Sequence, residues 1–511
     1  MRKEVVKAVL VVFVASFCTM VIELVAGRIM APYVGVSLYT WTSIIGVVLA
    51  GLSIGAYLGG ILADRYPTPK TLGWLLFASG LAALSISPLT GVVTRWQLET
   101  SLMIRILAVT AVIFFVPSTL LGMISPVVVR LSLDRLERSG NVVGKIYAFS
   151  TLGSILGTFA TGFFLISWMG TRNILLLMSL ILIVSSPFFG GAFLKRRVLM
   201  ILFPVLFVSL WAVHDQAFTK QRDDHSYYFK ETDYFTIELK KTEKDDHPLE
   251  MVVLDNLIHS FVDLEDPLHL QYGYERTYAD LIAWKAKNNH KFRVLIIGGG
   301  GYTFPRFLEA KYPEAQIDVV EIDAHLTQLA YQYLGLSPQT RIRTFNDDAR
   351  WTLMNFKEKG VYDFILGDAF NDLSIPYHLT TKEFSTLLRS LLKPEGLLIV
   401  NVIDHFQTGL FMPSYVRTLE EVFGRGKVAL VSDSAFEEMG ISTMIVSASA
   451  MEQRWKEAEE VNPENCYVIT PQEVDKKLQN RFAMILTDDH APVDNLTAPI
   501  FEERFGKKPR G

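Results

Sequence analysis

Six long apolar segments near the N-terminus constrain the fold of this chain more than any other feature of its sequence. A helix needs about 20 apolar residues to cross the hydrocarbon core of a bilayer. One such segment can be a core helix of a soluble protein, but six in series predict a transmembrane domain over residues 1–221. The first is too long, and followed by too many others, to be a cleaved signal peptide. The segments lie near 5–27, 39–63, 71–92, 102–129, 146–168 and 173–194.

The loops between these segments predict their orientation, because cytoplasmic loops carry an excess of Lys and Arg. With the N-terminus inside, the inner segments hold twelve of these residues and the outer loops hold four. A seventh apolar run at 198–213 is only about 16 residues long and contains Pro204, so it is a marginal span. We therefore expect a multi-pass protein of the cell membrane, with the lipid bilayer as a partner. The sequence leaves open on which side of the membrane the second half lies.

The two halves of the chain differ in charge. Residues 1–221 hold 17 Lys or Arg and 7 Asp or Glu, whereas residues 222–511 hold 32 and 46. Nucleic-acid binding needs a basic surface, so we expect no nucleic-acid partner for the acidic second half. Cationic or neutral substrates suit it better. The two cysteines, Cys18 and Cys466, provide neither a disulfide framework nor a cysteine-ligated zinc site, and no metal is expected.

Glycines recur at intervals of four residues within two of the apolar segments. Gly51, Gly55 and Gly59 lie in the second segment, and Gly153 and Gly157 lie in the fifth. Small residues at this interval let helix backbones approach closely. We therefore interpret these glycines as helix-packing positions.

The second half alternates between strand-like and helix-like segments. Residues 222–264 contain β-branched and aromatic runs between polar breaks, which predict a small β-rich subdomain. A helix-like stretch at 268–287 follows, and strands and helices then alternate. Such alternation specifies a parallel, doubly wound Rossmann sheet, which we assign to residues 265–450 with KVALVSD and STMIVSAS as its last strands. Residues 451–511 form a C-terminal extension.

Ligands of such a sheet bind outside the carboxyl ends of its strands. Gly298 to Gly301 follow the first strand and permit a tight turn whose N–H groups are free to meet a ligand. Glu321 follows the second strand at a spacing typical of a ribose ligand, although a turn or cap carboxylate is an alternative. Asp347 follows the third strand, where it can accept from an adenine amino group or cap a helix. Asp368 ends the fourth strand.

These elements, together with LDNLIHSF and QYGYERTY upstream and LTDDHAPVDNL near the end, resemble the spermidine synthase family of polyamine aminopropyltransferases. The resemblance spans about residues 226–450. With its apolar helices, the whole chain is similar to the membrane-bound branch that is fused to a major-facilitator-like domain. The resemblance implies a methyltransferase-like Rossmann domain. It also implies transfer of an aminopropyl group from decarboxylated S-adenosylmethionine to a polyamine such as putrescine.

The resemblance also implies the roles of individual residues. Asp368 would be the catalytic residue, which takes a proton from the acceptor amine. The acceptor would be bound by His259, Tyr274, Asn371 and Asp372, with His259 in place of the usual glutamine. The donor would be bound by Gly298, Gly299, Gly300, Glu321, Asp347 and Tyr228.

Two departures from the family pattern bear on the substrate. Aminopropyltransferases of the family have an aspartate directly after the third glycine, where it pairs with the amine of the donor, and this chain has Gly301 there. The acidic residue three places beyond the catalytic one is Asn371, with Asp372 as a substitute shifted by one residue. We also expect Tyr302 and Phe304 to make the surface beside the glycines apolar.

Three functions are consistent with these residues. The first is a membrane-anchored aminopropyltransferase. The second is a methyltransferase that uses S-adenosylmethionine on a membrane-associated or amine substrate, because Gly301 removes a carboxylate that would repel the carboxylate of that donor. The third is a transporter or sensor of a polyamine or nucleoside. In that case Glu23 and Arg28, which are ionisable residues at membrane depth, carry the function rather than form a structural ion pair. A homo-oligomer is compatible with each.

Overall fold

The computed structural model describes residues 2–34, 37–93, 102–133, 139–190, 225–245, 247–255, 257–287, 289–370, 375–436, 440–463 and 465–506. The chain divides into two compact units. The helical unit comprises Met1–Asp224 with Lys230–Asp233, and the α/β unit comprises His225–Phe229 with Tyr234–Gly511.

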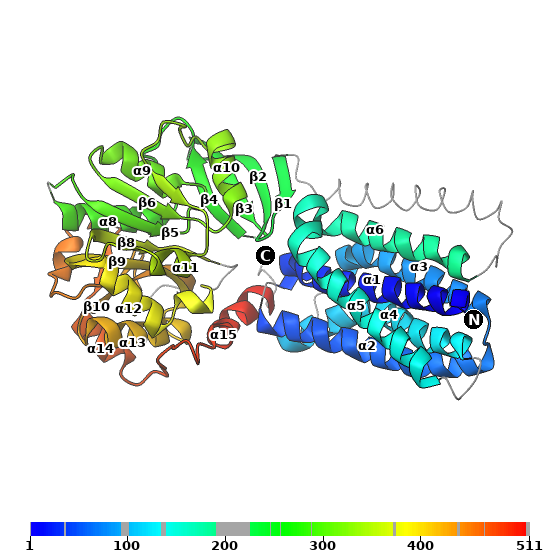
Figure 1. Cartoon of the computed structure of the whole chain (residues 1–511). Helices are drawn as coiled ribbons and strands as arrows, with labels where there is room; N and C mark the ends of the chain where they lie inside the picture. Colours follow the sequence, from blue (N-terminus) through cyan, green and yellow to red (C-terminus); the bar gives the residue numbers. More distant parts are fainter. Residues whose placement is uncertain are drawn as a thin grey trace. The chain divides into compact units, whose positions relative to one another are not determined.

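Long apolar helices that run alongside one another make up the helical unit (Figure 1). Six spans in the described residues are long and apolar enough to cross a membrane, judged by length and composition alone. Each overlaps one of the apolar segments of the sequence. The run at 198–213 lies outside the described residues. The helices are α1 (Arg2–Val34), α2 (Leu38–Arg65), α3 (Pro69–Val93), α4 (Leu102–Ser132), α5 (Ser139–Ala160), the π-helix η2 (Thr161–Leu165) and α6 (Ile166–Phe189).

Glycines allow two pairs of these helices to pack at close range. A Cβ atom at Gly55 on α2 would lie 2.1 Å from the carbonyl oxygen of Thr119 on α4. A Cβ atom at Gly153 on α5 would lie 2.3 Å from the carbonyl oxygen of Phe13 on α1. No side chain fits at these distances, so the interpretation of the glycines as helix-packing positions is confirmed.

A four-stranded sheet in the order β1-β2-β3-β4 precedes the main sheet of the α/β unit. Its strands are β1 (Ser226–Glu231), β2 (Thr236–Lys244), β3 (His247–Leu254) and β4 (Leu257–Asp263). Strands β2, β3 and β4 pair antiparallel. Buried side chains such as Leu239, Val252 and Val262 join one hydrophobic core with the helix that follows, α8 (Gly273–Ala286).

The main sheet has eight strands in the order β12-β10-β11-β9-β8-β5-β6-β7. Strands β5 to β9 are parallel and alternate with helices, so the predicted doubly wound Rossmann sheet is confirmed. The strands are β5 (Arg293–Ile297), β6 (Gln316–Val320), β7 (Arg343–Phe345), β8 (Tyr362–Gly367), β9 (Leu392–His405), β10 (Val428–Ser432), β11 (Ile441–Ala448) and β12 (Tyr467–Ile469).

The last strands depart from the predicted parallel arrangement. β11 pairs antiparallel with both β9 and β10, and β12 pairs antiparallel with β10. Residues 433–440 alone connect β10 to β11. A parallel pair needs a crossover of about a dozen residues or more, which this connection is too short to provide. The sheet is therefore mixed.

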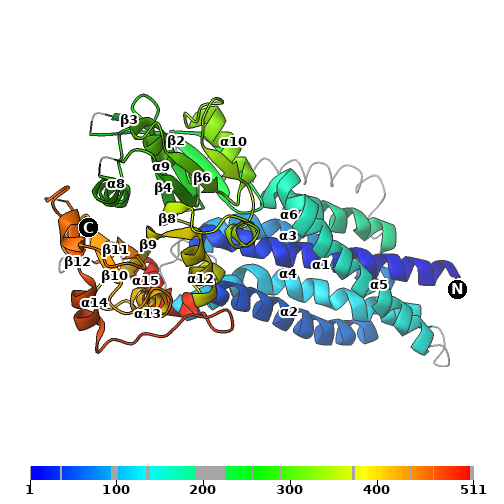
Figure 2. The ribbon, with the colours of Figure 1, turned by 60° about the vertical axis from the view of Figure 1, so that its left-hand side comes forward.

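Helices cover both faces of the main sheet (Figure 2). They are α9 (Thr303–Lys311), α10 (Ala324–Tyr333), α11 (Ala349–Met354), α12 (Lys382–Leu391), α13 (Phe411–Phe423), α14 (Pro471–Leu478) and α15 (Val493–Gly506), with the short helices η3 (Tyr377–Leu379) and η4 (Trp455–Ala458). Val294 and Ile296 of β5 belong to a core shared with α8, α9 and α10, whereas Leu295 and Ile297 belong to a core shared with α11, α12 and α13. Successive strand residues point to opposite faces, which explains this division.

Candidate active site

The glycine loop, Gly298–Gly301, connects β5 to α9. Gly298 has a φ of 98° and Gly300 a φ of 50°, conformations that favour glycine. A Cβ atom at Gly298 would also lie 2.4 Å from the carbonyl oxygen of Asp368. Glycine at this position therefore lets the loop lie against the residue that follows β8.

The N–H groups of the glycine loop are already bonded within the chain, so the expectation that they are free is wrong. Gly299 N donates to Glu321 Oε2 over 2.7 Å, and Gly301 N donates to Ser260 Oγ over 2.8 Å. The other carboxylate oxygen of Glu321 accepts from Asp323 N over 2.9 Å. Burial raises the pKa of Glu321, and the bonds from backbone N–H groups oppose that rise. Buried polar groups require hydrogen-bond partners, and here the loop N–H groups and the Glu321 carboxylate are partners of one another.

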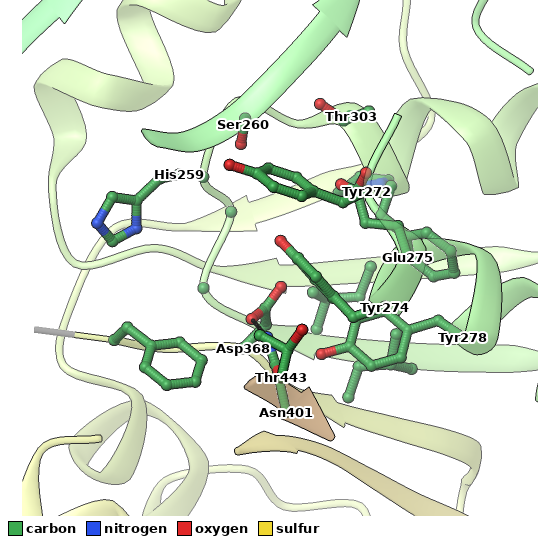
Figure 3. A pocket seen from close by; sticks show the side chains of 18 of the residues that line it. His259, Ser260, Tyr272, Tyr274, Glu275, Tyr278, Thr303, Asp368, Asn401 and Thr443 are labelled. Atoms are coloured by element: carbon green, nitrogen blue, oxygen red, sulfur yellow. Dashed lines mark hydrogen bonds between the residues drawn. The ribbon is translucent and has the colours of Figure 1, made fainter. Parts of the chain in front are cut away.

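A cavity of about 370 Å³, the large cavity, lies beside this loop in the α/β unit. Residues from β4, α8 and the ends of β8 and β9 line it, and Figure 3 shows Asp368 beside Asn401, with Tyr274 and Tyr278 next to them. The polar residues of its lining are His259, Ser260, Tyr272, Tyr274, Glu275, Tyr278, Thr303, Asp368, Asn401 and Thr443.

Asp368 directly follows β8, and its backbone packs against Gly298 of the glycine loop. Asn401 Nδ2 donates to Asp368 Oδ1 over 3.0 Å, and Tyr274 forms a second side-chain hydrogen bond to it. Burial raises the pKa of Asp368 to about 6 in spite of both bonds. Asp368 is thus mainly ionised at neutral pH and more basic than an exposed aspartate. It has the properties of a general base.

Glu275, in the first turn of α8, is a second acid of the large cavity that the sequence analysis did not identify. It is 3 % exposed, and burial together with the charge of Asp368 raises its pKa to about 8. Its position in QYGYERTY, beside the predicted Tyr274, was the available signal. Whether a helix carboxylate faces a cavity or solvent depends on packing, which that motif does not specify.

Several buried polar atoms of the large cavity have no hydrogen-bond partner among the described residues. They are Glu275 Oε2, the Tyr278 hydroxyl and Asn401 Oδ1. An unpaired buried polar group costs about 1 to 3 kcal/mol, so such a cluster suggests a ligand that supplies the missing partners. Two of the three atoms are acceptors when Glu275 is ionised. An amine or ammonium, whose hydrogens would pair with Asn401 Oδ1 and with Glu275 once it is ionised, is one such ligand.

A small cavity of about 180 Å³ is also lined by the glycine loop. Glu321, Asp347 and Ala349 line it, and Tyr234, Phe235 and Leu326 add apolar surface. The two cavities share His259, Gly298, Gly300, Asp368 and Phe370. Asp368 therefore lies where the two cavities meet.

Asp347 and Glu321 do not cap the helices that follow them, but Glu321 does act as a turn carboxylate, because its Oε1 accepts from Asp323 N over 2.9 Å. Asp348, not Asp347, caps α11, because its side chain accepts from Trp351 N over 2.9 Å. Likewise Asp323, not Glu321, caps α10. Both predicted donor-binding carboxylates thus remain at the small cavity.

Of the other predicted site residues, one lines the cavities, one lies outside their lining, and two lie outside the described residues. His259 lines both cavities, and burial lowers its pKa to about 4, so it is neutral at physiological pH. Tyr228 is absent from the lining of both cavities in the described part of the chain. Its hydroxyl lies 2.6 Å from His325 Nε2 on α10. Asn371 and Asp372 lie outside the described residues.

Ser260 and Val262 of β4 occupy the space beside Gly301. A Cβ atom at Gly301 would lie 2.7 Å from Ser260 Cβ and 2.9 Å from Val262 Cγ2. An aspartate would not fit there without movement of β4, so the departure from the family pattern is built into the packing. The expectation that Tyr302 contributes to the cavity surface is wrong. It is fully buried, with its hydroxyl near the hydroxyls of Thr327 and Thr344.

Comparisons with known proteins show which families this chain resembles. Residues 273–454 match the family model of the spermine/spermidine synthase domain. The polyamine aminopropyltransferase of Vibrio vulnificus is 41% identical over 133 residues, which cover 26% of this chain and 44% of that protein. The human eEF1A lysine and N-terminal methyltransferase is 29% identical over 147 residues, which cover 25% of this chain and 21% of that protein.

Among solved structures, a probable spermidine synthase from Corynebacterium glutamicum aligns with 52% of this chain and 96% of its own, with a TM-score of 0.45 and 24% identity. The chain spans less than half the length of the Vibrio relative. The family match includes α8, the glycine loop and Asp368, and it does not include β4. The resemblance to the spermidine synthase family is therefore confirmed over residues 273–454.

Proposed function

We propose that this protein is an aminopropyltransferase that moves an aminopropyl group from decarboxylated S-adenosylmethionine to a polyamine such as putrescine. One observation carries the proposal above the others. Asp368 is a buried carboxylate at the junction of two cavities, with a pKa raised to about 6. That position suits a group that receives a proton between two reactants.

The small cavity would hold the nucleoside part of the donor. Glu321 would bind the ribose hydroxyls and Asp347 the adenine amino group. The large cavity would hold the acceptor, whose ammonium and amine hydrogens would pair with Glu275, Asn401 and Asp368. Glu275 and Asn401 offer unpaired oxygen atoms in that cavity, and Asp368 offers its carboxylate charge. The acidic lining opposes the repulsion between a cationic donor and a cationic acceptor.

The reaction requires an amine with a free lone pair. Asp368 accepts a proton from the acceptor ammonium, and the amine nitrogen then attacks the aminopropyl carbon attached to the sulfonium. A C–N bond forms, and the C–S bond breaks with its electron pair on sulfur, which leaves neutral methylthioadenosine. Alignment of the two reactants across Asp368 supplies much of the rate enhancement.

We also propose that the helical unit anchors the enzyme in a lipid bilayer. Its six long apolar helices fit that role by length and composition. The bilayer is then a constitutive partner, and the substrate is a small amine rather than a macromolecule.

The test is product formation by the purified full-length protein. Putrescine and decarboxylated S-adenosylmethionine should yield spermidine and methylthioadenosine, and Asp368→Asn should lower kcat by about 10²-fold or more. Phe356→Leu, a conservative change outside the residues that line either cavity, is the matched control. Absence of product over a panel of diamines would refute the proposal.

A methyltransferase is the second candidate, supported by the packing around Gly301. That packing leaves no room for a carboxylate beside the donor's aminopropyl end, and the similarity to the human lysine methyltransferase points the same way. Calorimetric titration with each donor separates the candidates. Tighter binding of ordinary S-adenosylmethionine favours the methyltransferase, and tighter binding of the decarboxylated form favours aminopropyl transfer.

A further inference from the structure

Two histidines and an aspartate converge at the edge of the small sheet, away from both cavities. His247 begins β3, Asp263 ends β4, and His269 lies in the segment before α8. His247 Nδ1 lies 2.8 Å from Asp263 Oδ2, and His269 Nδ1 lies 3.0 Å from the same oxygen. Within the residues that the structure describes, this is the one group of three or more potential ligands whose donor atoms all lie within 4.8 Å of one another.

We propose that His247, Asp263 and His269 bind a zinc ion. Two imidazole nitrogens and one carboxylate oxygen are ligands that zinc prefers, whereas calcium and magnesium prefer oxygen alone. The proposal differs from the expectation that the chain holds no metal, which considered cysteine ligands. It goes beyond the proposed transferase activity and does not rest on it.

The distances suit a metal site after a small adjustment. With zinc-to-ligand bonds of about 2.0 to 2.2 Å, neighbouring atoms of a tetrahedral site lie about 3.3 Å apart. The observed separations of 2.8 and 3.0 Å are shorter by a few tenths of an ångström. Small rotations of the His247 side chain, which is 43% exposed, and of the His269 side chain, which is 19% exposed, can supply these differences. The same exposure lets a water molecule reach the fourth position.

The rest of the carboxylate is held in the orientation that a ligand needs. Asp263 Oδ1 accepts from Glu265 N over 3.0 Å and from Asp266 N over 2.9 Å, which leaves Oδ2 facing the two rings. Asp263 is nearly fully buried, and the imidazole rings lie 4.0 Å apart between centroids. Supporting hydrogen bonds of this kind orient metal ligands in proteins.

A zinc ion at this position would connect three segments of chain. It would tie β3 and β4 to the segment that leads into α8, and α8 carries Tyr274 and Glu275 of the large cavity. We therefore expect a structural role, in which the ion fixes the start of α8.

The experiment measures zinc retained by the full-length protein in detergent. After incubation with zinc chloride and gel filtration, elemental analysis should find one zinc per chain. His269→Asn and His247→Asn should each weaken zinc binding by about tenfold or more. Zinc should raise the melting temperature of the unmodified protein and not that of the double variant. Because His247 is partly exposed, its variant remains informative even if His269→Asn fails to fold.

His378→Asn is the matched control, because His378 Nε2 also lies 2.9 Å from an aspartate oxygen, that of Asp348, and this pair belongs to no group of three potential ligands among the described residues. Its zinc content should equal that of the unmodified protein. A hydrogen-bonded His–Asp–His cluster without metal is the competing arrangement. Zinc content well below one per chain, or equal content in the histidine variants and the control, would overturn the proposal.

Discussion

Asp368 and Glu275 share the large cavity, and their charges are coupled by proximity. The charge of Asp368 is one of the causes of the raised Glu275 pKa, and burial is the larger cause. Near neutral pH, therefore, Asp368 is ionised and Glu275 is largely protonated. A bound ammonium would favour ionisation of both, because an opposite charge stabilises the charged form.

The pH dependence of catalysis follows from the Asp368 pKa of about 6. The acceptor's proton can move to Asp368 only when the carboxylate is ionised. We expect kcat/KM to fall about tenfold for each pH unit below about pH 6. A pH–rate profile of the purified enzyme checks this. A profile without an acidic limb would mean that another group accepts the proton.

Glu275 should make the protein less stable as the pH rises. Its pKa in the fold is about 8, above the ordinary value of 4.5 for a glutamate, so its stabilising contribution is present below that lower value and is lost as the pH rises through about 8. Glu275→Gln should remove this loss and raise the unfolding free energy at about pH 9 by about 1 kcal/mol or more relative to the unmodified protein. Denaturant unfolding at acidic and alkaline pH provides the comparison; an equal effect at both would contradict it.

Gly301 should tolerate a side chain only if Ser260 is made smaller. A Cβ atom at Gly301 would lie 2.7 Å from Ser260 Cβ, so Gly301→Ala should destabilise the protein by about 1 to 3 kcal/mol. Ser260→Gly in the same chain should recover part of that loss. Thermal unfolding of the single and double variants measures the coupling, and additive effects would show that the two positions do not clash.

At the scale of helices and strands, the alternation of apolar and polar residues predicted most elements, but it did not predict how the last strands pair. The alternation from Arg293 to His405 specified β5 to β9, because each strand is a short apolar run and each connection is long enough for a helix. The antiparallel end of the sheet follows from the short connection at residues 433–440, and the apolar pattern of the strands does not indicate their direction. The position of Tyr228 against His325 could not be predicted, because it depends on how β1 meets α10.

The close contact of α2 with α4 predicts that a side chain is not tolerated at Gly55, on the face of α2 that packs against α4. Gly55→Leu should destabilise the helical unit by about 1 to 3 kcal/mol, because its side chain would meet the backbone of Thr119. Gly60→Leu is the matched control on the same helix, since a Cβ atom there has no neighbour within 4 Å. Thermal unfolding in detergent separates them; equal melting temperatures would exclude the packing role of Gly55.

For the whole molecule, the two halves have opposite charge balance and different physical character. The six apolar helices predict that the chain behaves as an integral membrane protein. Alkaline carbonate should leave it in the membrane pellet and detergent should release it, with a peripheral protein as control. Release by carbonate would contradict the proposed anchor. Sequence alone predicted the helices well because apolar length is a local property, whereas the cavities depend on distant segments that meet.

The bonds of Glu321 to the glycine loop have a consequence for the whole reaction cycle. Because Glu321 Oε2 accepts from Gly299 N, this N–H group has its hydrogen-bond partner within the chain. Ribose hydroxyls arrive at a carboxylate whose position is already set, so little ordering of the chain is needed on binding. In the proposed enzyme, Glu321 therefore keeps the donor site in its binding conformation between successive substrates.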